Sequence, residues 1–150
     1  MKAYVVDNPG SAEALTLKDI PVPDVKPGWV LIKIKAFGLN RSELYTRQGH
    51  SGADVPFPRV LGIECVGQVV NTSDTNLQVG QKVAAAMGKM GRHYDGGYAE
   101  YTLVPRSQVM PVETTLAWSD FGAIPETYFT AWGAMIEAIN VQSGDTVLVR

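Results

Sequence analysis

The sequence has little cysteine, no long apolar run and no excess of charge of one sign. Cys65 is the one cysteine among 150 residues, which excludes an internal disulfide and a zinc site built from four thiolates. No apolar stretch approaches the roughly 20 residues that a membrane-spanning helix needs, and the N-terminal segment lacks the apolar region of a signal peptide. Thirteen basic residues stand against fifteen acidic ones, so nothing indicates a nucleic-acid or membrane partner.

What is present is an ordinary globular composition, with 45% hydrophobic and 19% charged residues. Such a chain is too apolar for disorder, and its length suffices to bury roughly 70% of its unfolded surface. Fifteen glycines and nine prolines indicate many turns between short strands. We expect a cytoplasmic protein with one domain, or with one domain and the beginning of a second.

Most of the chain is predicted to form short strands. In the first, Ile32 and Ile34 alternate with two lysines, which is the period of a half-buried strand. The second is interrupted at Gly62 and Gly67, where we expect a bulge or the close approach of another backbone. Many short strands with frequent turns favour a β-barrel or a sandwich. The expected strands cover residues 30–36, 60–70, one that follows the turn at 79–83, and 97–104.

The pattern changes near the C-terminal end of the chain. Ser119 can cap a short helix, and Pro125 suits the first turn of a longer one. Apolar residues recur at helical spacing over 128–139, and residues 146–150 are typical of a buried strand in a parallel sheet. A helix followed by such a strand is the beginning of an α/β unit, but no further helix or parallel strand follows in this sequence. We therefore expect a truncated chain. The predicted domains are 1–122 and the entrance to a second domain, 123–150.

Seven segments resemble, in order, the medium-chain dehydrogenase/reductase superfamily. The resemblance implies a mainly β, GroES-like barrel with short helices as catalytic domain. It also implies that the first helix and strand of an absent Rossmann domain, which would bind NAD(P)H, follow the barrel. The chain ends before any glycine-rich phosphate-binding turn, so we expect these 150 residues alone to be inactive. The segments are residues 1–4, 29–40, 61–67, 79–83, 96–101, 123–132 and 143–145.

Two positions depart from the zinc alcohol dehydrogenases of this superfamily. Those enzymes have a cysteine and a histidine where this sequence has Asn40 and Ile63. A carboxamide is a poor ligand for Zn²⁺ and an alkyl side chain is none. The cysteine-rich lobe that holds a structural zinc is also missing. The sequence is therefore more similar to the zinc-free quinone oxidoreductase branch, whose members reduce quinones or enones with NADPH, and we expect no metal site.

The resemblance implies two cofactor-binding residues, Asn40 and Thr130. Asn40 would lie at the cleft end of its strand, where its amide could bind the nicotinamide ribose or carboxamide, or else satisfy backbone groups of the turn. Thr130 matches a threonine that contacts nicotinamide in the family. Glu64 matches a glutamate that is usually a buried structural carboxylate. The aromatic residues of the last helix are expected in the core: Tyr128, Phe129 and Trp132.

Three residues are candidates for the substrate side of the site. Tyr45 could hydrogen-bond a substrate carbonyl, or its ring could pack against the barrel. Ser51 stands where family members often have a tyrosine as candidate proton donor, but a serine hydroxyl is a much weaker acid. His50 is a candidate proton donor because histidine is a common general acid, although an exposed loop histidine would give the same pattern.

Three functions remain open from the sequence. The favoured one is hydride transfer from NADPH to a quinone or enone, with a small molecule as partner and room for a homodimer of the full-length protein. The second is zinc-dependent alcohol oxidation. The third is a non-catalytic, GroES-like binding or assembly module, because a fold does not dictate a function. The substrate, and the choice between NADPH and NADH, depend on residues outside this chain.

Overall fold

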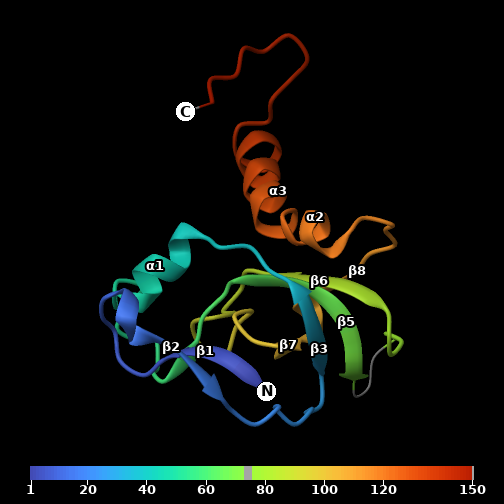
Figure 1. Cartoon of the computed structure of the whole chain (residues 1–150). Helices are drawn as coiled ribbons and strands as arrows, with labels where there is room; N and C mark the ends of the chain where they lie inside the picture. Colours follow the sequence, from blue (N-terminus) through green and yellow to red (C-terminus); the bar gives the residue numbers. More distant parts are fainter. Residues whose placement is uncertain (73–75, 150) are drawn as a thin grey trace.

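The computed structural model describes residues 1–72 and 76–149 (Figure 1). The strands within them are β1 (Lys2–Val6), β2 (Leu15–Asp19), β3 (Trp29–Ala36), β4 (Arg59–Val60), β5 (Glu64–Thr72), β6 (Lys82–Ala86), β7 (Tyr101–Pro105) and β8 (Val109–Pro111). The helices are α1 (Arg41–Arg47), α2 (Trp118–Gly122) and α3 (Pro125–Trp132), with a π-helical extension over Gly133–Ala138 and short 3-10 turns at Ala12–Ala14 and Arg106–Gln108. The chain is mainly β with few short helices, as expected.

The strands form two antiparallel sheets. One has the order β2-β1-β4, and the larger has the order β7-β3-β5-β6-β8. In the larger sheet β3 lies between β7 and β5, and it pairs Lys33 with Gln68 of β5 and with Tyr101 of β7. Figure 1 shows this sheet curled into part of a barrel, with α1 to one side of it and α2 and α3 above β5 and β6. The curled sheet confirms the barrel class.

The main core lies on the inner face of the larger sheet. In β3, Val30 and Ile32 are fully buried while Lys33 is exposed, so the predicted alternation is correct. Each fully buried aliphatic side chain of this kind contributes roughly 1.5–3 kcal/mol. Cys65 belongs to the same cluster, and burial raises the pKa of its thiol to about 12. The thiol is therefore protonated at neutral pH and packs as a small apolar group.

The predicted strand over residues 60–70 is divided in two. At Gly62 the backbone has φ +103, and a Cβ there would lie 2.6 Å from the Gly97 nitrogen. Gly62 lies in the interruption between β4 and β5. At Gly67, inside β5, a Cβ would lie 2.2 Å from the Lys33 carbonyl oxygen of β3. Both glycines mark a close approach of another backbone, as expected.

Two expectations about the helices differ in outcome. α3 begins at Pro125, as predicted, because proline has no N–H to lose at the first helical position. The cap of α2 is Ala117, so the prediction that Ser119 caps this helix is wrong. Ser119 lies inside the first turn, where its hydroxyl donates to Asp120.

The C-terminal part of the chain projects away from the barrel (Figure 1). Tyr128, Phe129 and Trp132 were expected in the core, but Tyr128 is 67% exposed and Trp132 61% exposed. Among the described residues α3 packs on the sheet mainly along β5 and β6, and these side chains stay exposed. The predicted strand over 146–150 is not formed at residues 146–149, which pair with no strand of the described residues, and Arg150 lies outside those residues. A strand needs a partner for its N–H and C=O groups.

Candidate functional site

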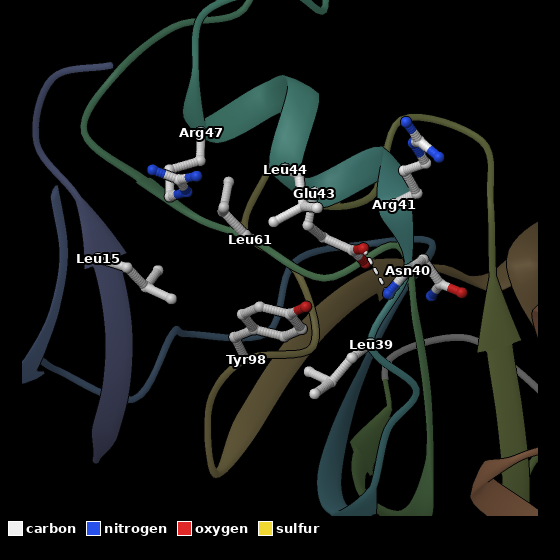
Figure 2. A pocket seen from close by; sticks show the side chains of 9 residues that line it. All are labelled: Leu15, Leu39, Asn40, Arg41, Glu43, Leu44, Arg47, Leu61 and Tyr98. Carbon is white, nitrogen blue, oxygen red and sulfur yellow. Dashed lines mark hydrogen bonds between the residues drawn. The ribbon is translucent and has the colours of Figure 1, made fainter. Parts of the chain in front are cut away.

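The site is organised around Asn40, where β3 leads into α1. Asn40 has extended backbone (φ −111, ψ 150) and is the N-cap of α1, a position that asparagine favours. Glu43 is the third residue of the helix, and its Oε2 accepts the backbone N–H of Asn40 at 2.8 Å (Figure 2). This capping box fixes the direction in which the chain leaves Asn40.

The Asn40 amide connects α1 to β5 and α3. Its Nδ2 donates to Oε1 of Glu64 at 2.8 Å, and Oε2 of Glu64 accepts the backbone N–H of Glu126 at 2.8 Å. Glu64 is 3% exposed and is the first residue of β5. Glu126 is the second residue of α3, so the carboxylate satisfies one of the free N–H groups at that helix start. Glu64 is thus the buried structural carboxylate that was expected.

Thr130 lies one helical turn after Glu126. Its hydroxyl donates to Oε1 of Glu126 at 2.9 Å. The polar residues Asn40, Glu64, Glu126 and Thr130 therefore form one connected chain of contacts, called the polar chain below. It brings both predicted cofactor residues into one site. The sequence reasoning missed Glu126, although an acidic residue in a helix first turn is a usual start signal.

Glu43 is a second buried carboxylate beside Asn40. It is 3% exposed, and its Oε1 accepts the backbone N–H of Ile63 at 3.0 Å. Burial raises the pKa of Glu43, and the hydrogen bonds from Ile63 and Asn40 only partly oppose this effect. From its sequence Glu43 was expected as a solvated acidic residue or a local salt-bridge partner, and burial shows that this expectation is wrong. The sequence signal for its actual place is the Asn-x-x-Glu spacing of a capping box.

A cavity of about 530 Å³ lies between α1 and the barrel (Figure 2). This volume is in the range of small-molecule sites. Tyr98 is 8% exposed, and Figure 2 shows its hydroxyl pointing toward the Asn40 and Glu43 end. Burial, with the charges of Glu43 and Glu64, raises the pKa of Tyr98 well above 10, so the phenol is a hydrogen-bond donor at neutral pH. The lining residues are Leu15, Leu39, Asn40, Arg41, Glu43, Leu44, Arg47, Leu61 and Tyr98.

Tyr45 and His50 lie at the far end of α1 and in the turn that follows. Tyr45 is 46% exposed, its ring faces the Arg41 guanidinium at 5.9 Å, and its carbonyl accepts the His50 N–H at 2.8 Å. His50 is exposed. Both side chains are therefore accessible, and neither touches the polar chain within the described residues.

Ser51 has a different environment. Its hydroxyl lies 2.7 Å from the hydroxyl of Thr46, a buried residue of α1. Thr46 donates its one proton to the Ser42 carbonyl at 3.1 Å, so Ser51 is the donor of the shorter contact. The Ser51 proton is thereby directed into the protein.

Asn40 and Ile63 occupy the two positions where the zinc enzymes have metal ligands, and neither side chain is a good ligand for zinc. Asn40 turns its amide nitrogen to Glu64, and Ile63 is buried. In residues 1–72 and 76–149, no three His, Cys, Asp or Glu side chains lie close enough together to hold a metal ion. His93, the other histidine, pairs with Asp54 at 2.9 Å. No helix of the same residues is long and apolar enough to cross a bilayer.

Comparison with known proteins identifies the family. Residues 26–114 match the alcohol dehydrogenase GroES-like domain. Human quinone oxidoreductase is 34% identical over 156 aligned positions, which cover 100% of this chain and 45% of that enzyme. Among solved structures, an NAD-dependent alcohol dehydrogenase has a TM-score of 0.88 and 28% identity, over 97% of this chain and 49% of the other.

A mycobacterial protein solved in complex with NADPH has a TM-score of 0.84 and 28% identity, over 97% of this chain and 44% of the other. The chain thus spans less than half the length of these relatives. The family match covers more than half of the chain, and the similarity of fold extends over nearly all of it. The chain therefore belongs to the alcohol dehydrogenase GroES-like domain family of the medium-chain dehydrogenase/reductase superfamily.

Proposed function

We propose that this chain forms one wall of the active site in a zinc-independent oxidoreductase that transfers hydride from NADPH to a quinone or an enone. The observation that carries this proposal is the polar chain, which joins Asn40 to Thr130 across the barrel and α3. Two relatives support it, because one is a quinone oxidoreductase and another was solved with NADPH.

The residues present suit the carboxamide of a nicotinamide, which offers both N–H donors and a carbonyl acceptor. Thr130 uses its proton on Glu126, so its oxygen remains able to accept. Asn40 uses one N–H of its amide on Glu64 and keeps a second N–H to donate. NADPH, when bound, supplies the hydride; the protein supplies orientation and excludes water. The phosphates need residues beyond this chain, so these 150 residues alone should not oxidise NADPH.

Zinc does not fit the same site. A four-coordinate zinc needs thiolate, imidazole or carboxylate ligands, and the positions concerned offer a carboxamide and an alkyl group at Asn40 and Ile63. The Asn40 amide is also held by Glu64, so it is not free to turn. We therefore assign no step of the reaction to a metal.

Reduction of a quinone or an enone requires a proton as well as a hydride. Of the three candidate donors, Tyr45 and His50 are exposed at the end of α1. Ser51 donates to Thr46 and would have to break that contact to serve. We assign proton delivery to Tyr45 or His50, with Ser51 as a residue that holds the turn.

The cofactor assignment is tested with T130V in the intact protein that contains this chain. Loss of one hydrogen bond should raise the KM for NADPH by about tenfold, while T127V, a matched change on the same helix, should have no effect. Thr127 is a suitable control because its hydroxyl donates to the Ala123 carbonyl. Equal KM values for T130V and the wild type would contradict the assignment.

The absence of a metal step is tested separately by elemental analysis of the intact protein. We expect less than about one zinc in ten chains, and quinone reduction that a chelator does not inhibit. Stoichiometric zinc would overturn the zinc-independent mechanism and restore the alcohol dehydrogenase alternative.

A further inference from the structure

Tyr98 lies on the barrel side of the cavity beside α1, and its phenol is held in place. Its backbone N–H donates to the Leu61 carbonyl at 2.9 Å, and its own carbonyl accepts the Tyr4 N–H at 2.8 Å. The centroid of its ring lies 5.0 Å from that of Phe37, and a Cβ at Gly62 would lie 2.8 Å from its Cδ1. The direction of the phenol is therefore fixed before a ligand binds, which lowers the entropy lost on binding.

The Tyr98 hydroxyl is a donor without a protein partner. No hydrogen bond of this hydroxyl joins it to any residue that the structure describes. Figure 2 shows it directed along the cavity toward the end where Asn40 and Glu43 lie. Tyr98 is 8% exposed, and a tyrosine hydroxyl in such a position usually has a hydrogen-bond partner. The unused donor therefore points to a ligand with an acceptor oxygen.

The other polar groups at this end of the cavity already have partners. The two oxygens of Glu43 accept the N–H groups of Asn40 and Ile63, at 2.8 and 3.0 Å. The Asn40 amide donates to Glu64, and under the proposed function its second N–H serves the nicotinamide. The Tyr98 hydroxyl is then the donor that is left for the substrate.

The remainder of the cavity lining is mainly apolar. Of its two arginines, Arg41 is exposed, and Nη1 of Arg47 donates to the Gly10 carbonyl at 2.7 Å. A volume of about 530 Å³ has room for an aromatic ring beside a carbonyl group. A donor at one end of an apolar cavity suits a neutral aromatic carbonyl compound. The apolar lining residues are Leu15, Leu39, Leu44 and Leu61.

We propose that this cavity binds enones or quinones that carry an aromatic ring, and that the Tyr98 hydroxyl donates a hydrogen bond to their carbonyl oxygen. This inference rests on the proposed function. Addition of hydride to the conjugated carbon moves an electron pair onto that oxygen, so the hydrogen bond stabilises the transition state more than the substrate. Tyr98 keeps its own proton, because burial raises its pKa. Proton delivery stays with Tyr45 or His50.

The test compares benzylideneacetone, an enone with a phenyl ring, with methyl vinyl ketone, which has none, as substrates of the intact protein. The wild type should have the higher kcat/KM for benzylideneacetone. Y98F removes only the hydroxyl and should lower kcat/KM for both enones by about 10- to 100-fold, with the KM for NADPH unchanged. Y101F is the matched control and should change neither value, because Tyr101 lies on β7, outside the cavity lining.

A second variant tests the position of the ring. L44W places a larger side chain in the cavity lining and should lower kcat/KM for benzylideneacetone more than for methyl vinyl ketone. L116W is its control, because Leu116 is similarly exposed and lies outside that lining.

Binding of benzylideneacetone by isothermal titration calorimetry gives a readout that does not need turnover. Weaker binding to Y98F and L44W than to Y101F and L116W supports the cavity even if the enone is not reduced, in which case the proposed function alone fails. The inference is overturned if the wild type does not bind benzylideneacetone, if Y98F binds it as tightly as Y101F does, or if L44W impairs both enones equally.

Discussion

Glu43 and Glu64 are two buried carboxylates on either side of Asn40, and they act on different parts of it. Glu43 accepts the backbone N–H of Asn40, while Glu64 accepts its side-chain amide. The remaining oxygens accept backbone N–H groups of Ile63 and Glu126. Buried charges are tolerated when they are hydrogen-bonded. We conclude that both glutamates are positioning residues, and that the orientation of the Asn40 amide depends on them.

At the scale of single residues, we predict that Glu43 makes the free energy of unfolding depend on pH. Because burial raises its pKa above the ordinary value of 4.5, the folded state binds the Glu43 proton more tightly than the unfolded state. The stability that this group contributes is complete below pH 4.5 and is lost as the pH rises through the raised value. The free energy of unfolding of the wild type minus that of E43Q should therefore fall across this window, measured by urea denaturation.

The control for this measurement is E13Q, which should give the opposite sign. The hydrogen bond from Ser11 lowers the pKa of Glu13, so its contribution is present above the unfolded pKa and lost as the pH falls. A difference between wild type and E43Q that stays constant with pH, or that rises with pH, would show that burial does not dominate at Glu43.

At the scale of elements, the contact between β3 and β5 depends on Gly67. A Cβ at this position would lie 2.2 Å from the Lys33 carbonyl oxygen, which belongs to backbone that cannot move without breaking the ladder. We predict that G67A lowers the free energy of unfolding by about 3 kcal/mol, measured by chemical denaturation. G133A is the matched control, since a Cβ at Gly133 meets no atom within 4 Å. Equal stability of the two variants would contradict this close approach.

Comparison of the predicted elements with the structure shows which features local sequence patterns can predict. The alternation of β3 and the proline start of α3 were predicted correctly, because both depend on neighbours in sequence. The break between β4 and β5 was only partly predicted. It arises where Gly62 meets Gly97, 35 positions away, and sequence periodicity does not contain that contact.

At the scale of the whole molecule, the exposed apolar face of α3 is the main irregularity. The chain spans less than half the length of its relatives, and a contiguous apolar face of this kind marks an interaction site. We predict that the 150-residue chain binds the dye ANS strongly and that W132Q lowers the dye fluorescence severalfold. L17Q removes an exposed apolar side chain elsewhere, on β2, and should change it little. Equal fluorescence of W132Q and L17Q would show that the α3 face is not the dye site.

The sequence by itself determined the mainly β class and the start of α3 at Pro125, because period and turn residues are local along the chain. Asn40 and Thr130 became candidate site residues through the resemblance to a family, and their roles stay predictions. Only the tertiary structure decided that Glu64 and Glu126 connect Asn40 to Thr130. The physical reason is that a buried polar group takes whichever partner folding brings within about 3 Å, and that partner can lie anywhere in the sequence.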